Sequence, residues 1–203
     1  MNKIPTLFQR DPADRGRLLP EVSPGCEWVL AGQGHATRKW DGTACLVRDG
    51  RLYRRAMVKP PRPDPPGFEL AQHDFVTGKR FGWVPVTGGP DERWHLEGWA
   101  NLHALAAHHP DYLGETPANG TYELVGPRVN GNPDGFATHE LIFHGWARSH
   151  VELADLDACP RTFHELAAWL GARPYEGVVW HHPDGRMAKA KRRDFPVALP
   201  LAA

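Results

Sequence analysis

The chain has 203 residues, 41% of them hydrophobic, and no formal net charge, a composition typical of an ordinary globular protein with one well-packed domain. It shows no apolar run of about 18 residues and no basic-then-apolar start, so we expect neither a membrane span nor a secretory signal. The three cysteines lie far apart, which argues against a disulfide framework or a thiolate zinc site and favours a cytoplasmic location.

The first predicted element is a β-hairpin. Thr43–Arg48 and Arg51–Arg55 are short strand-like runs that flank Asp49-Gly50, a dipeptide typical of tight hairpin turns. The segment that follows, Pro60–Pro90, is rich in proline and glycine and shows little periodicity. We interpret residues 60–90 as an insertion or as a flap over a binding site.

Helices and further strands are expected beyond residue 90. Apolar residues at helical spacing from Leu96 to Ala106 predict one helix. Thr162-Phe-His-Glu165 is typical of a capping-box start, which predicts a second helix with Gly171 as its C-cap. The runs interpreted as strands are Tyr122–Val125, Glu140–Phe143, Gly177–His181 and Arg186–Lys191. The last two flank a His-Pro-Asp-Gly turn and should form a second hairpin.

Positive charge is concentrated in two segments of this neutral chain. Arg48–Arg62 carries six Lys or Arg residues and one acidic residue, and Arg186–Arg193 carries five and none. Such clusters indicate a focused site for a polyanion. Two solvated faces of the protein would give the same pattern.

Lys39 opens a short motif, Lys39-Trp-Asp-Gly42, that would prove little if it stood alone. An exposed strand lysine is the ordinary interpretation. The functional one is an amine that attacks the α-phosphorus of a nucleotide and expels pyrophosphate. Because free lysine has a pKa of about 10.4, cationic neighbours such as Lys189 and Lys191 would favour the nucleophilic amine and offset charge on the phosphate. Alternate positions on a strand place both of these lysines on one face.

Four further residues are candidates for holding the nucleotide. Glu176 precedes an apolar run and is predicted to bind Mg²⁺, or Mn²⁺ in its place, directly or through water; its ordinary alternative is a buried glutamate paired with an arginine. Glu123 is expected to accept a hydrogen bond from a ribose hydroxyl, or to be a plain edge-strand glutamate. Phe143 and His144 could stack on the base, although packing in the core is the commoner use of phenylalanine.

Four short motifs follow one another along the chain, namely Lys39–Gly42, Glu123–Gly126, Glu176–Val179 and Lys189–Lys191. In this order they resemble motifs I, III, IV and V of the covalent nucleotidyltransferase superfamily, which contains ATP-dependent ligases and capping enzymes. Longer segments are similar to the compact ATP-dependent 5′-to-3′ RNA ligase family that includes the vertebrate RNA ligase. These segments are Lys39–Cys45, Gly82–Val86, Glu123–Pro133 and Glu176–His181. The similarity runs from about Thr37 to Arg193.

The resemblance implies an α+β fold, with residues 1–203 forming a single nucleotidyltransferase domain of the ATP-grasp-like ligase adenylylation type, in which helices pack around antiparallel sheets. It implies that Lys39 takes AMP from ATP and passes it to an RNA 5′-phosphate, after which a 3′-hydroxyl displaces AMP. Arg55 falls at the motif Ia arginine, near the ribose or the RNA end. The expected partners are ATP and RNA with 5′-phosphate and 3′-hydroxyl ends.

Two other functions stay open at this point. An mRNA-capping guanylyltransferase would use the same lysine with GTP, and no residue fixes adenine over guanine; the resemblance and the lack of room for an OB-fold favour the ligase. A catalytically silent module that binds a nucleotide or an RNA end is the other alternative. The intact set of Lys39, Glu176, Lys189 and Lys191 argues against it.

Overall fold

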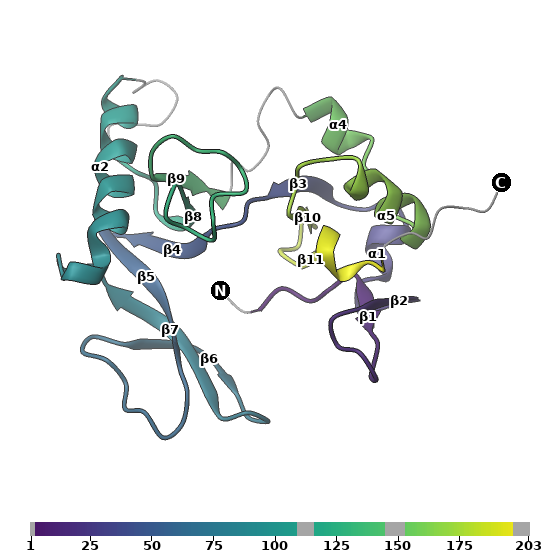
Figure 1. Cartoon of the computed structure of the whole chain (residues 1–203), viewed down its shortest axis with the longest axis horizontal. Helices are drawn as coiled ribbons and strands as arrows, with labels where there is room; N and C mark the ends of the chain where they lie inside the picture. Colours follow the sequence, from purple (N-terminus) through teal and green to yellow (C-terminus); the bar gives the residue numbers. More distant parts are fainter. Residues whose placement is uncertain (1–2, 109–115, 145–152, 197–203) are drawn as a thin grey trace. The chain divides into compact units, whose positions relative to one another are not determined.

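The computed structural model in Figure 1 describes residues 3–108, 116–144 and 153–196. These residues form two compact units. Unit 1 is built from the described residues between Asp41 and Trp146, and unit 2 from those of Lys3–Trp40 and Ala147–Ala203. Both units combine helices with antiparallel strands, which confirms the expected α+β class.

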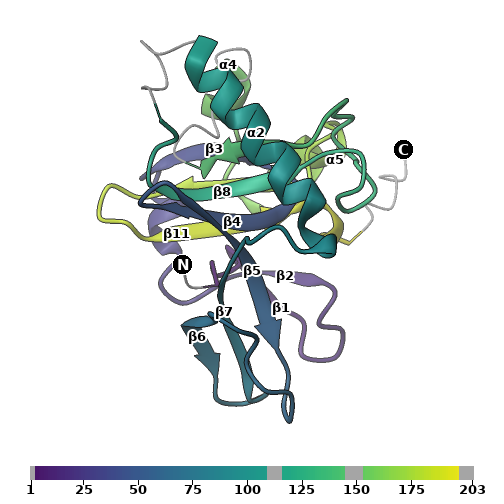
Figure 2. The same ribbon diagram turned by 90° about the vertical axis from the view of Figure 1, so that its left-hand side faces the viewer.

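Unit 1 is a six-stranded antiparallel sheet in the order β6-β7-β5-β4-β8-β9, with one long helix against it. Its strands are β4 (Thr43–Arg48), β5 (Arg51–Val58), β6 (Glu69–Asp74), β7 (Lys79–Pro85), β8 (Gly120–Val125) and β9 (Glu140–Phe143). The helix α2 (Arg93–His108) follows the 3-10 turn η1 (Pro90–Glu92). Figure 2 shows α2 lying across the β4 and β8 region of the sheet.

The core of unit 1 lies between this helix and one face of the sheet. Cys45 of β4 is opposite Tyr122 of β8, and both are buried in one apolar cluster with Leu102 of α2. Because side chains alternate along a strand, the neighbouring pair Ala44 and Glu123 projects from the other face. The position of each unit 1 site residue follows from this alternation.

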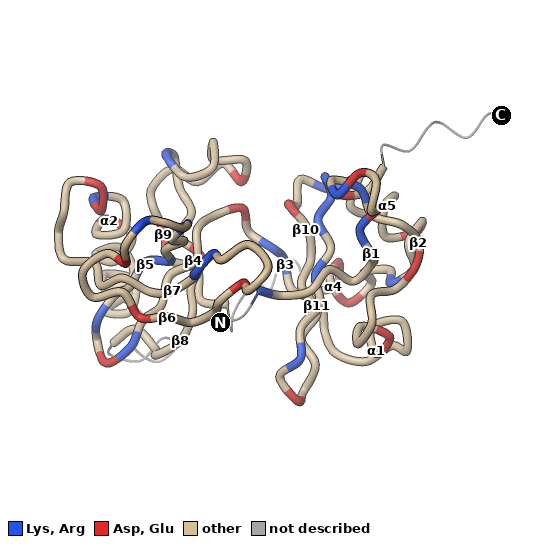
Figure 3. The backbone as a smooth tube through the Cα atoms, turned by 90° about the horizontal axis from the view of Figure 1, so that it is seen from below, with Lys and Arg blue, Asp and Glu red and all other residues tan. Residues whose placement is uncertain are grey.

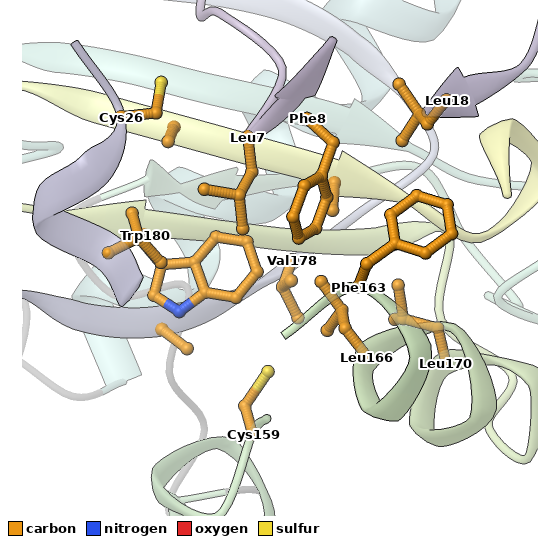
Figure 4. Packing of buried hydrophobic residues seen from close by; sticks show 14 of the residues in the cluster. Leu7, Phe8, Leu18, Cys26, Cys159, Phe163, Leu166, Leu170, Val178 and Trp180 are labelled. Atoms are coloured by element: carbon orange, nitrogen blue, oxygen red, sulfur yellow. The ribbon is translucent and has the colours of Figure 1, made fainter. Parts of the chain in front are cut away.

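Unit 2 contains a three-stranded antiparallel sheet in the order β11-β10-β3 and a separate two-stranded sheet. Its strands are β1 (Phe8–Arg10), β2 (Leu18–Val22), β3 (His35–Lys39), β10 (Gly177–His181) and β11 (Met187–Lys191). Its helices are α1 (Glu27–Leu30), α4 (Leu153–Asp157), α5 (Phe163–Gly171) and the 3-10 turn η3 (Arg192–Asp194). Figure 4 shows the core, where Trp180 and Val178 of β10 meet Phe8 and the helix residues Phe163 and Leu166.

Both predicted hairpins are confirmed, because β4 pairs with β5 and β10 pairs with β11. The two other expected strands and both helices are also present. The expected capping box is wrong: the Thr162 hydroxyl donates to the Glu165 carboxylate, and the side chain of Thr162 makes no capping bond. The C-cap is Ala172, one residue beyond the expected Gly171. No helix in the described ranges has the length and apolar character needed to cross a membrane.

The segment from Pro60 to Pro90 contains the hairpin β6–β7, which the sequence pattern did not indicate. Strand β7 also pairs with β5 over six residues, so this segment extends the central sheet. Its role as a flap stays a prediction, as does the organisation of residues 1–203 as one domain.

Candidate functional site

The three-stranded sheet of unit 2 carries Lys39, Lys189 and Lys191 on one face. Gly177 of β10 is opposite Lys39 on one side and Lys191 on the other, and Val179 is opposite Lys189. Directly opposed residues and alternate residues along a strand share a face. The sheet therefore aligns the three amines, and we call this side the lysine face.

The opposite face of the same sheet is the core of unit 2. The residues that alternate with the lysines are apolar and buried, namely Ala36, Val178, Trp180, Ala188 and Ala190. Burial of these side chains fixes the register, because a shift by one residue would move the lysines into the core. The hydrophobic pattern thus determines which way the lysines project.

Glu176 lies immediately before β10 and bridges two of the lysines. Its Oε2 is paired with Nζ of Lys39, and its Oε1 is 2.5 Å from Nζ of Lys191. The carboxylate side chain is only 6% exposed. Burial alone raises its pKa, but the charge of Lys39 and the hydrogen bonds from both lysines outweigh that effect and lower it. Glu176 is therefore an ionised carboxylate that holds two ammonium groups, instead of the arginine partner that its ordinary interpretation requires.

Lys189 is the lysine of this cluster whose pKa is shifted. Burial, together with the positive charges of Lys191 and Lys39, lowers its pKa from 10.5 to about 8. A lysine that titrates in this range changes its charge with a small change in its surroundings. Such a group is suited to contact an anion that arrives and departs.

Glu176 is also the residue of this cluster that fits a divalent cation. A carboxylate is a hard oxygen ligand of the type that Mg²⁺ takes from proteins. Nowhere in the described ranges do three or more His, Cys, Asp or Glu side chains gather in a way that could hold a metal ion. A cation at Glu176 would therefore draw its remaining ligands from nucleotide phosphates and water, the usual arrangement for phosphate-bound Mg²⁺.

Gly177 allows the close strand spacing on which the cluster depends. A Cβ at this position would lie 2.0 Å from the carbonyl oxygen of Ala190 and 2.9 Å from Cα of Lys191. The backbone N–H of Arg192 also donates to the carbonyl of Glu176 at 2.8 Å. Glu176 and Gly177 thus have separate roles: the glycine leaves space for β11 to lie close to β10, and the glutamate pairs with the ammonium groups of Lys39 and Lys191.

In unit 1, Glu123 and His144 are brought together. The Nε2 atom of His144 is 3.1 Å from Oε2 of Glu123, and its Nδ1 is 2.9 Å from Oγ1 of Thr121. The Glu123 side chain is 12% exposed. The structure thus gives His144 a contact that can orient Glu123, and its expected stacking on the base stays a prediction.

Phe143 is not brought together with Glu123. It is opposite Tyr122 on the face that packs against α2, and the two ring centroids are 5.0 Å apart. Glu123 follows Tyr122 in the strand and so projects from the other face. The structure places Phe143 in a core position.

Arg55 shares the face of Glu123. Its neighbour Arg54 is opposite the buried Cys45, so Arg55 points away from the core of unit 1. Its guanidinium carbon lies 4.9 Å above the ring of Trp83, and among the described residues its buried Nη1 has no hydrogen-bond partner. Burial lowers its pKa. A partly buried cation with an unsatisfied donor is suited to receive an anionic group.

Two supporting features were missed by sequence reasoning. In unit 1, Nδ2 of Asn130 donates to Oδ1 of Asp41 at 3.0 Å and to the carbonyl of Gly42 at 2.8 Å. In unit 2, the Arg38 guanidinium carbon lies 3.8 Å from the ring of Trp40 and 4.6 Å from that of Tyr175. The first could have been suspected because Asn130 lies in a segment that carries the family resemblance. For the contact of Arg38 with Trp40 and Tyr175, the sequence offered no indication beyond the alternation of side chains along a strand.

Comparison with known proteins gives a consistent set of relatives. A family model described as RNA ligase 1 matches residues 77–203. RNA ligase 1 of Rattus norvegicus is 25% identical, with 82% of this chain and 68% of that protein covered. RNA ligase 1 of Danio rerio is 26% identical and covers 89% of this chain and 73% of its own length. RNA ligase 1 of Pongo abelii is 26% identical over 81% of this chain and 68% of its own length.

Proposed function

The chain belongs to the RNA ligase 1 family, and from this premise we propose that it is an ATP-dependent RNA ligase. It joins an RNA 5′-phosphate to a 3′-hydroxyl through lysyl-AMP and RNA-adenylate intermediates. The observation that carries the proposal is the lysine face, where the Glu176 carboxylate bridges the ammonium groups of Lys39 and Lys191 beside Lys189.

In the first step, Nζ of Lys39 attacks the α-phosphorus of ATP. A nitrogen–phosphorus bond forms, the bond from the α-phosphorus to the bridging oxygen breaks, and pyrophosphate leaves with the electron pair. The amine must give up a proton before it attacks. Glu176 orients the amine through its contact with Nζ.

Lys189 and Lys191 offset the negative charge that develops on the phosphate oxygens. Preorganised cations in a partly buried site act more strongly there than in water, and they need no rearrangement during the reaction. Mg²⁺ or Mn²⁺, held by Glu176 and the nucleotide phosphates, would supply further positive charge at the same oxygens. One oxygen of Glu176 contacts Lys39 and the other contacts Lys191.

The unit 1 residues are proposed to hold the nucleoside and the RNA end. Glu123, oriented by His144, accepts a hydrogen bond from a ribose hydroxyl. Arg55 offers its unsatisfied donor to the ribose or to the RNA end. We leave base stacking by Phe143 out of the proposed site, because this ring packs against Tyr122.

The two later steps use the same charges. The RNA 5′-phosphate attacks the phosphorus of lysyl-AMP, so that a phosphoanhydride forms and Lys39 leaves as the amine. The RNA 3′-hydroxyl then attacks the 5′-phosphorus, a phosphodiester forms, and AMP departs. The first two steps transfer an adenylyl group and the third forms the phosphodiester, and in each of them the same cations offset charge on the phosphate oxygens.

Covalent labelling tests the first step. The protein is incubated separately with ATP and with GTP in the presence of Mg²⁺, and its intact mass is measured. We expect an AMP adduct that Lys39→Arg lacks, because a guanidinium is too weak a nucleophile although it keeps the charge. A GMP adduct would identify a capping-type guanylyltransferase, and no adduct with either nucleotide would identify a catalytically silent module.

A ligation assay tests the substrate. We expect the protein to seal RNA strands with a 5′-phosphate and a 3′-hydroxyl better than matched DNA strands. Arg55→Ala should reduce sealing, while Arg51→Ala, which removes an exposed arginine from the same strand, should have little effect. Equal sealing of RNA and DNA would disprove the RNA preference, and a requirement for a 5′-hydroxyl would disprove the mechanism.

A further inference from the structure

The β6–β7 hairpin ends in an exposed apolar tip. Phe75 is 87% exposed and Val76 is 95% exposed, the two highest values among the exposed large hydrophobic residues of the described chain. Figures 1 and 2 both show this hairpin extending beyond the part of the sheet that α2 covers. Two adjacent large apolar side chains that stay almost entirely in water form a small contiguous apolar patch, the kind of feature that marks an interaction site.

The turn itself holds Phe75 outward. Oδ1 of Asp74 accepts the backbone N–H groups of Val76 and Thr77, each at 3.1 Å. The ring of Phe75 lies against that of His73, with the centroids 4.5 Å apart. The tip is therefore a defined turn that presents an aromatic pair, and not a loose loop that could fold its apolar side chains inward.

Basic residues surround this tip. A Cβ at Gly78 would lie 2.9 Å from Cγ of Pro60, and Nη2 of Arg80 donates to the carbonyl of Arg62 at 2.9 Å. These contacts bring the exposed loop Lys59–Arg62 beside the hairpin, where Lys79 is opposite Asp74. Residues 48–84 contain eight Lys or Arg and four Asp or Glu in a chain with no net charge.

Elsewhere in the chain, Arg186–Arg193 is a second basic segment, with five Lys or Arg residues and no acidic one. Figure 3 shows Lys and Arg positions in both units, together with acidic positions. Near the tip, part of the negative charge is already paired, because Arg80 binds Asp64 at 3.1 Å and Lys79 lies opposite Asp74. The exposed cations Lys59 and Arg62 thus give this end of the sheet a surplus of positive charge.

We infer that the β6–β7 tip is a contact surface for single-stranded RNA, in which Phe75 stacks on a base while Lys59, Arg62 and Lys79 bind the flanking phosphates. An aromatic ring within a basic patch is the combination that binds single strands without reading their sequence. Two apolar side chains bury too little area to anchor a membrane, yet they suffice to stack one base. The choice of RNA rests on the proposed function, and the surface itself rests on the hairpin geometry.

RNA binding by fluorescence anisotropy tests the inference. The probe is a short fluorescein-labelled single-stranded RNA with a 5′-phosphate, measured without ATP. Phe75→Ala should raise the Kd about tenfold, since stacking on an aromatic side chain contributes about 1–3 kcal/mol per base. Phe75→Trp should bind like the parent, because it keeps a stacking surface. Leu105→Ala, a truncation at a side chain of α2 that is 49% exposed, should leave the Kd unchanged.

The outcomes separate this inference from the proposed function. A Kd for Phe75→Ala within about twofold of the parent, or an equal loss in Leu105→Ala, would overturn the hairpin surface even if the parent forms an AMP adduct and seals RNA. A parent that forms no adduct but binds RNA through Phe75 would disprove the ligase and support the hairpin. Phe75-dependent sedimentation with anionic vesicles, without Phe75-dependent RNA binding, would show a membrane contact and overturn the RNA assignment. AMP-adduct yield should be the same in parent and Phe75→Ala.

Discussion

Glu176 supplies the negative charge that pairs with two of the ammonium groups of the lysine face. A carboxylate with 6% exposure would be costly if it had no partner, but here each of its two oxygens contacts one ammonium group. The lysines Lys39 and Lys191 are themselves partly accessible, at 20% and 17%. The cluster is thus buried at its acidic centre and open at its basic rim, where a phosphate can approach.

Glu176→Gln should weaken both catalysis and stability. The amide keeps the shape but leaves two ammonium groups without a counter-charge. We expect the rate of AMP-adduct formation to fall about 100-fold. The free energy of unfolding should fall by about 1–2 kcal/mol, less than for a fully buried pair because both lysines contact water. Urea denaturation and timed intact-mass measurements check the two effects. Glu21→Gln, an exposed change in the same unit, is the control, and an equal effect there would contradict the assigned role.

Lys189→Met should separate stability from activity. The pKa of Lys189 is lowered to about 8 in the folded protein from 10.5, so between these values the unfolded chain binds a proton that the folded chain does not. The contribution of Lys189 therefore destabilises the fold fully below about pH 8, and stability rises with pH from about 8 to 10.5. Lys189→Met should remove this rise, increase the melting temperature at pH 7 by about 2–4 °C, and slow AMP-adduct formation.

Melting curves of parent and Lys189→Met across this pH range provide the measurement. Lys59→Met, at an exposed position, should reproduce the pH profile of the parent. A variant of Lys189 that melts lower at pH 7, or that keeps the rise in stability above pH 8, would show that this amine is not destabilised by its surroundings.

At the scale of elements, the lysine face depends on the spacing of β3, β10 and β11. Gly177 is opposite both Lys39 and Lys191. At this glycine β11 lies so close to β10 that an added Cβ would be 2.0 Å from the carbonyl oxygen of Ala190. Strand spacing at this glycine therefore controls the distance between the two amines that Glu176 bridges.

Gly177→Ala should lower the free energy of unfolding by about 1–3 kcal/mol through overpacking. It should also reduce the AMP-adduct rate in protein that remains folded, because the added methyl group displaces β11. Gly171→Ala is the matched control: a Cβ there meets nothing within 4 Å, and alanine should leave stability unchanged or increase it by up to about 1 kcal/mol. Normal activity and stability of Gly177→Ala would contradict the close approach.

At the scale of the whole molecule, each unit has its own apolar cluster. The cluster of unit 2 includes Leu166 and Trp180, both fully buried, and the cluster of unit 1 includes Leu124 and Cys45. The proposed site residues are divided in the same way, with the lysine face in unit 2 and Glu123, His144 and Arg55 in unit 1. The two groups of residues are therefore supported by separate cores.

Leu166→Ala should destabilise unit 2 by about 2–5 kcal/mol. If the two cores are energetically separate, amide hydrogen exchange should become faster in α5, β10 and β11 and change little in β4 and β8. Leu124→Ala should give the reverse pattern. A uniform increase in exchange over both units would instead show one cooperative unit, as the single-domain prediction expects.

Local signals determined much of this fold. The Asp49-Gly50 turn and the alternation in β10 and β11 predict their hairpins, because turn residues and hydrophobic period act over a few positions. The ordered motifs around Lys39, Glu176 and Lys189 predict a phosphoryl-transfer site. They do so because the chemical role of each of these residue types can be read from the sequence alone. Strands β6 and β7 were both missed, because they lie in a segment rich in proline and glycine, and Glu69–Asp74 has little strand character apart from its pairing with β7.

Only the tertiary structure decided which partners these residues have. The sequence by itself determined the amines, the carboxylates and the sides of the strands on which they lie. It did not show that Glu176 bridges Lys39 and Lys191, that His144 orients Glu123, or that Phe143 packs in the core. These are contacts between residues far apart in the chain, and they depend on strand register and on the burial of neighbouring side chains, which are set when the sheets assemble.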